Sequence, residues 1–412
     1  MPQKRSSFIP AGHTCLTIAL GLIITAGCGT ADKAPEPSPV PDLVAATEGV
    51  IRVAELSRAG KVDSTDQNSD EFIWRLFVQF VSPAYADAPK PVVFETWASD
   101  KETFSKTPQW PGRGAPKKFQ SSVLHWLASH HTGPIDVPFN PPGNAAVGGF
   151  PTTGTPTPWI AEEVRRNRPM FDYIVNNGLN TKAGLAVAYA KNFKVTMPTT
   201  AIAVKGDWVP VKTLLQWIPE IGTMERLYEL YYTGVSDSVE YALVSMHVSS
   251  RRNANWVWGT FEHHLSPGRA DDIGSWDTFG ATTPRTLPNL RKINTQYGPC
   301  PKTEKLMALM EEAHLSPVWQ NYCLKSSQVD FNAPDGTPYV LGNSVIERIV
   351  GNGTVAISSC ISCHSYASFN AKGQPSSAAI AMLPYNPTGA TIPAVLDSAL
   401  QFDFMWGVVL AP

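Results

Sequence analysis

Two short stretches in the middle of the chain decide the fold: Tyr241–Val248 (YALVSMHV) and Trp256–His263 (WVWGTFEH). Both are rich in apolar, β-branched and aromatic residues, which favour strands. The polar segment 249–255 between them is typical of a turn. We therefore expect two strands that pair antiparallel.

Other elements flank this pair. Alternating apolar residues over Ala201–Val209 predict a third strand. Apolar side chains from Phe72 to Val81 recur at helical spacing and predict a helix that ends before Pro83. Three more segments have a helical pattern: residues 43–56, 119–131 and 304–315. The sequence therefore predicts an α+β fold, with a β-rich N-terminal core and surrounding helices.

The composition limits the class of protein. Apolar residues make up 43% of the 412 residues, which is enough for a buried core. Charged residues are only 17%, and 36 prolines indicate many loops. The net charge of −2 provides no basic field for a phosphate backbone, so we expect no nucleic-acid partner.

Residues 1–27 have the pattern of a secretory signal peptide. Lys4 and Arg5 precede an apolar run from Cys15 to Ala26, and small residues follow. A transmembrane helix needs about 20 apolar residues, and this run is shorter. We therefore expect export and cleavage.

The segment Thr25–Cys28 (TAGC) resembles the lipobox of bacterial lipoproteins, which implies lipidation of Cys28. Thr25 stands where that motif usually has Leu, so ordinary cleavage is the alternative. Alternating prolines then make residues 28–42 an extended tether. We expect a periplasmic protein, either an outer-membrane lipoprotein that contacts the membrane only through its anchor or a soluble protein.

The chain contains a Cys-x-x-Cys-His string, Cys360–His364 (CISCH), which is the signature of covalent c-type haem attachment. Two thiols at this spacing reach the two vinyl groups of one porphyrin, and His364 becomes the proximal iron ligand. Composition alone would produce the string about 0.002 times in a chain of this length. Zinc or a thioredoxin-like pair would need further ligands or a βαβ context, and neither is evident. We expect one covalent haem c held by Cys360, Cys363 and His364.

Two other cysteines, Cys300 and Cys323, enclose the helical pattern at 304–315. In an oxidising compartment we expect them to form a disulfide.

The strand pair at 241–263 is similar to proteobacterial exported proteins known as cytochrome c family proteins, and so are residues 200–208 and 344–364. The resemblance extends from Trp74 to the C-terminus and implies an exported monohaem protein without assigned catalytic residues. A capping box at Ser344–Glu347 predicts a short helix ahead of the haem motif, as in class I cytochromes c. The resulting layout is an α+β region at 43–299 integrated with a short helical, cytochrome c-like haem-binding region at 300–412.

The ligand opposite His364 decides between two functions. The candidates are His247, on the same predicted strand face as Leu243 and Ser245, and Met382, 18 residues after His364. Met405 is interpreted as a core residue. A strong second ligand gives single-electron transfer with a periplasmic redox partner, whereas an open iron suits an oxidase, peroxidase or oxygenase. Glu262 beside His263 is a candidate acid–base pair for the second function, although we interpret both as members of a satisfied surface cluster.

Overall fold

The two central stretches pair as predicted in the computed structural model of the chain. They form β7 (Val239–Ser250) and β8 (Val257–His263), antiparallel neighbours in which His247 lies opposite Thr260. The predicted strand at 201–209 is β5 (Ile202–Pro210), which pairs antiparallel with the other side of β7. These three predictions are confirmed.

The structure describes residues 66–113 except 87, residue 115, and residues 161–266, 277–282, 300–343, 358–383 and 387–412. Several predictions lie outside these residues: the signal peptide 1–27, Cys28, the tether 28–42, the helices at 43–56 and 119–131, and the capping box Ser344–Glu347.

Seven strands among the described residues form one antiparallel sheet in the order β3-β4-β5-β7-β8-β9, with β6 paired to the start of β7. The remaining strand bounds are β3 (Ala98–Ser99), β4 (Ala161–Arg166), β6 (Thr233–Ser236) and β9 (Tyr322–Gln328). The α+β class is thus confirmed. Because β9 belongs to the 300–412 region, the two predicted regions share this sheet.

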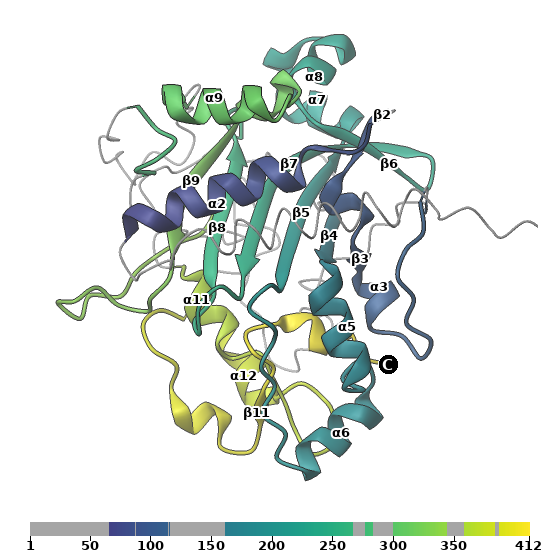
Figure 1. Cartoon of the computed structure of the whole chain (residues 1–412), viewed down its shortest axis with the longest axis vertical. Helices are drawn as coiled ribbons and strands as arrows, with labels where there is room; N and C mark the ends of the chain where they lie inside the picture. The colour runs from purple at the N-terminus through teal and green to yellow at the C-terminus, as the bar shows by residue number, and fades with distance from the viewer. Residues whose placement is uncertain are drawn as a thin grey trace, which may run out of the picture. The chain divides into compact units, whose positions relative to one another are not determined.

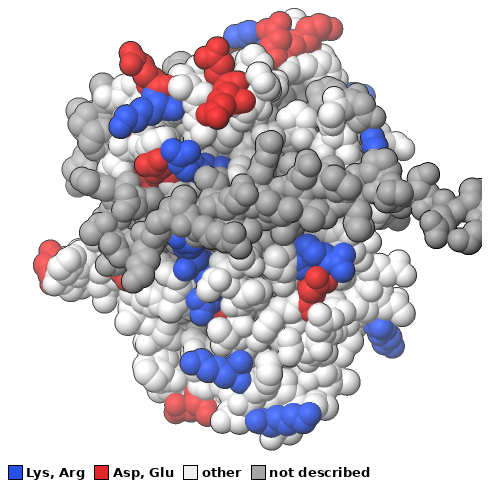
Figure 2. All heavy atoms as spheres, viewed as in Figure 1, with Lys and Arg blue, Asp and Glu red and all other residues white. Residues whose placement is uncertain are grey.

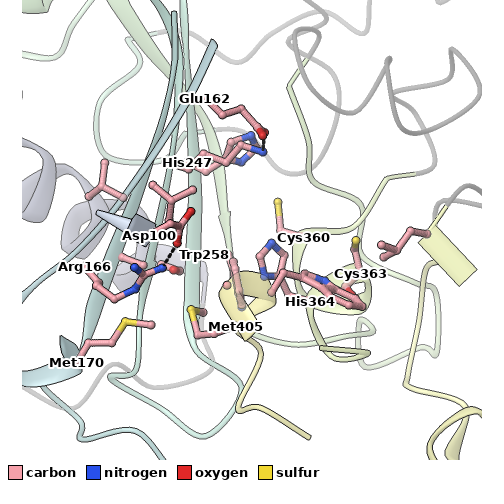
Figure 3. Close-up of a pocket in the computed structure, with 18 of the residues that line it drawn as sticks. Asp100, Glu162, Arg166, Met170, His247, Trp258, Cys360, Cys363, His364 and Met405 are labelled. Carbon is pink, nitrogen blue, oxygen red and sulfur yellow. Dashed lines mark hydrogen bonds and ion pairs between the residues drawn. The ribbon is translucent and has the colours of Figure 1, made fainter. Parts of the chain in front are cut away.

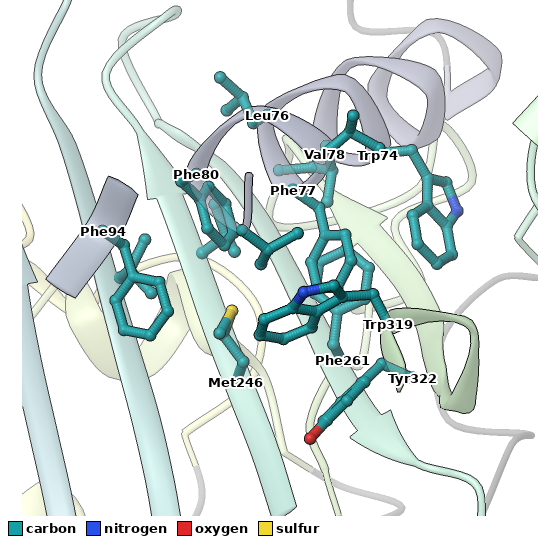
Figure 4. Close-up of a cluster of buried hydrophobic side chains, with 14 of the residues drawn as sticks. Trp74, Leu76, Phe77, Val78, Phe80, Phe94, Met246, Phe261, Trp319 and Tyr322 are labelled. Carbon is teal, nitrogen blue, oxygen red and sulfur yellow. The ribbon is translucent and has the colours of Figure 1, made fainter. Parts of the chain in front are cut away.

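One face of the sheet is covered by α2 (Asp66–Phe80), which lies across β8 and β9 (Figure 1). This helix confirms the pattern at 72–81 and ends at Phe80. Figure 4 shows its aromatic side chains directed into the core, where Phe77 stacks on Phe261 at 4.3 Å between ring centroids. Each fully buried ring of this kind contributes about 1.5–3 kcal/mol by leaving water.

A β-bulge changes which residues share a face of β7. Asp207 lies opposite Ser245 and Trp208 opposite Leu243, so Val244 is an extra residue in β7. Leu243 consequently joins the core under α2 instead of lying on the face of His247. The alternation that assigned Leu243 to the His247 face was wrong at this position because a bulge has no signature in a strand of apolar residues.

The other helices fall into two groups (Figure 1). α7 (Val211–Trp217), α8 (Met224–Leu230) and α9 (Glu304–Glu312) lie near one end of the strands. Near the opposite end lie α5 (Arg168–Asn176), α6 (Lys182–Ala190), α11 (Cys360–His364) and α12 (Ser377–Met382). A second apolar cluster joins this latter group to the sheet through Trp258 and Ala203.

Two small two-stranded sheets and several single turns complete the described residues. They are β1 (Pro83–Tyr85) with β2 (Ala88–Val92), β10 (Ser368–Phe369) with β11 (Leu400–Gln401), the helix α3 (Asp100–Thr103) and five 3-10 turns at 93–96, 219–221, 317–321, 393–396 and 406–410. In the described part of 358–412, α11 and α12 are therefore accompanied by turns and the β10–β11 pair. Pro393 begins the 3-10 turn at 393–396, a position where its missing N–H breaks no hydrogen bond within the turn.

The exterior carries both signs of charge. In Figure 2 acidic side chains gather around α8 and α9, whereas Lys and Arg are scattered around α5 and α6. None of the described helices combines the length and apolar character that crossing a bilayer requires.

Candidate functional site

The Cys-x-x-Cys-His motif forms α11, a short helix fastened to the sheet. Ser359 caps it by accepting a hydrogen bond from the Ser362 backbone at 3.3 Å. Gln328, the last residue of β9, accepts from the Ile361 backbone at 3.2 Å and donates to Ser359 Oγ at 2.9 Å. The motif is thus attached to the same sheet that the central strands build.

Beside α11 lies a pocket between the motif and the sheet. It contains about 1280 Å³ of empty space, including its opening to solvent. Cys360, Cys363 and His364 lie on one side of it (Figure 3). The opposite side is the sheet face that α2 does not cover, with residues from β4, β5, β7 and β8. Apolar side chains supply much of the remaining lining: Phe104, Val164, Met170, Trp258, Leu383 and Trp406.

His364 is held in a single orientation. Its Nδ1–H donates to the Phe404 carbonyl at 2.7 Å, and its ring lies 4.5 Å from the Trp258 ring. Nε2 has no hydrogen-bond partner among the described residues. Burial is the main cause that lowers the pKa of His364 to about 4, so the imidazole is neutral at neutral pH. A neutral ring with Nδ1 bonded to a carbonyl presents Nε2 as a metal ligand.

The two thiols of the motif are not joined to each other. Cys360 is buried, with its Sγ 3.5 Å from the Leu341 carbonyl, and Cys363 is half-buried. Both line the pocket together with His364. Two thiols and an imidazole beside a largely apolar pocket are the donor set and the surroundings that a covalently attached haem requires, so these residues fit that cofactor.

The sheet side of the pocket carries four buried or half-buried charges. Asp100 pairs with Arg166, and Glu162 pairs with Lys205 (Figure 3). Desolvation by burial raises the pKa of Asp100 despite the adjacent Arg166 guanidinium. None of these four residues was predicted from the sequence as part of the site. Glu162 and Arg166 belong to AEEVRR, which has the composition of a solvated segment. The pairing of β4 with β5 brings Glu162 to Lys205 and places Arg166 opposite Ala203.

His247 lies on the same wall, next to Lys205 on β5 and Thr260 on β8. Its Nε2 accepts a hydrogen bond from Asn343 Nδ2 at 2.8 Å, and Asn343 also donates to Thr260 Oγ1 at 3.1 Å. Burial, followed by the charge of Lys205, lowers the pKa of His247 well below its usual value. The structure therefore brings His247 and His364 to one pocket, both as neutral imidazoles.

The two methionines considered from the sequence are placed differently. Met382, at the end of α12, is half-buried against the second apolar cluster and is not among the described residues that line the pocket. Met405 is buried and lines the pocket.

Glu262 and His263 are core residues rather than a surface cluster, which corrects the interpretation made from the sequence. Glu262 pairs with Lys325, and both side chains are fully buried. His263 donates through Nε2 to the Leu230 carbonyl at 3.0 Å and stacks on Tyr231 at 3.6 Å. Neither residue is among those that line the pocket in the described part of the chain. Both were misread because a charged and a polar residue at a strand end resemble exposed ones in sequence.

The structure contains the expected disulfide between Cys300 and Cys323, whose Cα atoms are 5.8 Å apart. Cys323 is the second residue of β9, and α9 lies within the loop that the disulfide closes. The disulfide therefore fastens that loop to the edge strand.

The chain was compared with protein-family models, with curated proteins and with solved structures, and none of the three comparisons finds a match.

Proposed function

We propose that the protein is an exported monohaem c-type cytochrome that carries single electrons in the periplasm. The observation that carries the proposal is the state of His364 in the pocket. Its Nδ1 is bonded to the Phe404 carbonyl at 2.7 Å, and its Nε2 has no partner among the described residues. A proximal haem ligand needs this arrangement.

Three residues of the motif would hold the cofactor. Cys360 and Cys363 would supply the two sulfurs for covalent attachment, and His364 would supply the nitrogen that binds the iron. The bound haem would supply a one-electron couple between ferric and ferrous iron. The apolar side chains of Phe104, Trp258 and Trp406 exclude water from one part of the pocket. Exclusion of water would change the reduction potential of a bound haem.

The cytochrome c-like character of residues 300–412 is part of the same proposal. In it, α11 with its Gln328 anchor supplies the attachment site, and β4, β5 and β7 of the N-terminal region supply the opposite wall. The haem is then enclosed by the whole unit rather than by the C-terminal segment alone.

For electron transfer, a second strong ligand must face His364. His247 is our candidate because it is a buried, neutral imidazole on the pocket wall. Coordination through Nε2 would require this nitrogen to exchange its hydrogen bond from Asn343 for the metal. Met382 has less support because it lies away from the pocket lining.

A second function, that of a haem-dependent oxidase, peroxidase or oxygenase, is favoured by two observations. Asn343 donates a hydrogen bond to Nε2 of His247, and a His247 that kept this bond would not bind the iron of a haem held by His364. The pairs Asp100–Arg166 and Glu162–Lys205 also make the wall polar enough to orient a small ligand.

One experiment separates the two functions. The visible spectrum of the reduced protein is recorded with and without carbon monoxide. Electron transfer with two strong ligands predicts low-spin bands that carbon monoxide leaves unchanged. A carbon monoxide-dependent shift of the Soret band would overturn the first function in favour of the second.

Export, lipidation of Cys28 and a periplasmic redox partner are also proposals, supported by the N-terminal sequence alone. Expression of the full chain and of Cys28→Ser, followed by fractionation, tests the anchor. We expect the wild type in the outer-membrane fraction and the variant in a different fraction. Equal distribution of both would contradict lipidation.

A further inference from the structure

The backbone next to the proximal histidine adopts an unusual conformation. Asp403 and Phe404 are consecutive non-glycine residues with positive φ, 43° and 69° respectively. Left-handed backbone is unfavourable for a residue with a side chain, and it persists only where surrounding contacts enforce it. At Asp403 the contacts that enforce this backbone conformation are hydrogen bonds to its carboxylate.

The Asp403 carboxylate is clamped by three donors from distant parts of the chain. Its Oδ2 accepts from the Met197 backbone at 2.6 Å and from Arg251 Nε at 3.0 Å. Its Oδ1 accepts from the Trp256 indole N–H at 3.2 Å. Arg251 directly follows β7, and Trp256 directly precedes β8, so the sheet itself holds this carboxylate.

The pair of Asp403 and Arg251 is shielded from water. The Arg251 side chain is 14% exposed and that of Asp403 is 7% exposed. Arg251 is itself fixed, because its Nη1 donates to the Asn253 carbonyl at 2.6 Å. A shielded, charge-assisted bond between fixed groups holds geometry better than an exposed ion pair.

The consequence appears one residue further on. The positive φ values turn the chain so that the carbonyl of Phe404 lies 2.7 Å from His364 Nδ1. The adjacent Met405 backbone closes the turn by donating to the Phe402 carbonyl at 3.0 Å. The strained residues Asp403 and Phe404 therefore position the Phe404 carbonyl, which fixes the tautomer of His364 by accepting from its Nδ1–H.

We propose that Asp403 is a positioning residue for the proximal ligand, which acts by holding the Phe404 carbonyl against His364 Nδ1. The inference rests on the proposed function. An imidazole that donates to a carbonyl is a stronger ligand and stabilises ferric iron. Asp403, with Arg251 as its charge partner, thereby sets the reduction potential from outside the pocket lining.

The test compares Asp403→Asn with a matched control, Glu262→Gln. Glu262 is likewise a buried carboxylate paired with a cation, Lys325, but it lies in β8 and not in the turn that carries the Phe404 carbonyl. Each full-length variant is matured with haem, and its midpoint potential is measured. In Asp403→Asn we expect the equilibrium between oxidised and reduced forms to move at least tenfold toward the reduced form. In Glu262→Gln we expect no such change.

Arg251→Gln leaves the Asp403 carboxylate and its Met197 and Trp256 donors in place. It is the second test variant, used if Asp403→Asn does not fold and accumulate. We expect a smaller change in the same direction, and Arg251→Lys should restore part of it. An unchanged potential in the Asp403 or Arg251 variants, in a wild type that carries haem, would overturn this inference alone. A wild type without covalent haem would overturn the proposed function and this inference together.

Discussion

The rings of Trp258 and His364 lie 4.5 Å apart, with their planes inclined by 46°. Trp258 belongs to β8, the second of the two central strands, and His364 ends the Cys-x-x-Cys-His helix. More than a hundred residues separate the two in sequence. Their contact places the motif against the sheet and makes Trp258 part of both the core and the pocket.

Trp258→Ala should therefore affect stability strongly. The side chain is 4% exposed and its indole N–H donates to the Asn255 carbonyl at 2.9 Å. We expect a loss of about 3–5 kcal/mol in the free energy of unfolding, measured by denaturant titration. Val187→Ala, at a residue 53% exposed on α6, should change it by less than about 0.5 kcal/mol. Equal effects of both substitutions would contradict the packing described for Trp258.

Substitution of the two distal candidates should separate them. His247 lies on the pocket wall, whereas Met382 packs against the second apolar cluster. We expect His247→Ala to change the low-spin bands of the haem-loaded protein and to permit carbon monoxide binding. Met382→Leu, a substitution of similar volume, should leave the spectrum unchanged. The reverse pattern would assign the ligand to Met382.

A buried carboxylate that is not among the described residues lining the pocket predicts a pH dependence of stability. Burial, reinforced by the nearby Asp277 charge, raises the pKa of Asp70 from 3.8 to about 6. The folded protein therefore binds this proton more tightly than the unfolded chain does. The stability that protonation contributes is fully present below about pH 4 and is lost as the pH rises to about 6.

Asp70→Asn should flatten this dependence, because an amide does not titrate. Over the same pH range the wild type should lose on the order of 3 kcal/mol relative to the variant. Asp335→Asn is the control, since Asp335 is exposed and its pKa is lowered rather than raised. Unfolding free energies measured between pH 4 and pH 7 check the prediction, and parallel profiles for wild type and Asp70→Asn would refute it.

The Cys300–Cys323 disulfide should stabilise the fold by lowering the conformational entropy of the unfolded chain. It joins residues 23 positions apart, for which loop-closure entropy predicts about 3 kcal/mol. We expect the Cys300→Ser, Cys323→Ser double variant to unfold at correspondingly lower denaturant concentration. Wild type treated with reductant should match it, and a variant as stable as the oxidised wild type would count against the prediction.

The elements with strong local patterns were predictable from the sequence. The helical spacing of Phe72 to Val81 and the apolar runs of β5, β7 and β8 could be identified from local sequence, because most residues of these segments are apolar and buried. Other strands carry no such pattern. β9 reads YCLKSSQ and includes Lys325, which is buried only because Glu262 on β8 pairs with it. Pairing between distant segments creates such strands, and local sequence does not record it.

The site divides in the same way. Cys360, Cys363 and His364 lie within five consecutive residues, so a local sequence motif is enough to predict haem attachment. His247 could be proposed because it lies on a predicted strand that the family resemblance includes, although a histidine on such a strand is more often a core residue. Arg166, Lys205 and Asp403 come from three separate elements and acquire their roles through the register of β4 with β5 and through the Arg251 contact. Their positions follow from tertiary packing alone.

Covalent attachment of haem is the claim on which the proposed function depends. The most direct measurement is the intact mass of the denatured full chain, matured together with the c-type haem attachment machinery. The account predicts a mass increase of one haem in the wild type and none in the Cys360→Ser, Cys363→Ser double variant. A wild-type chain that matures and folds without added mass would contradict it.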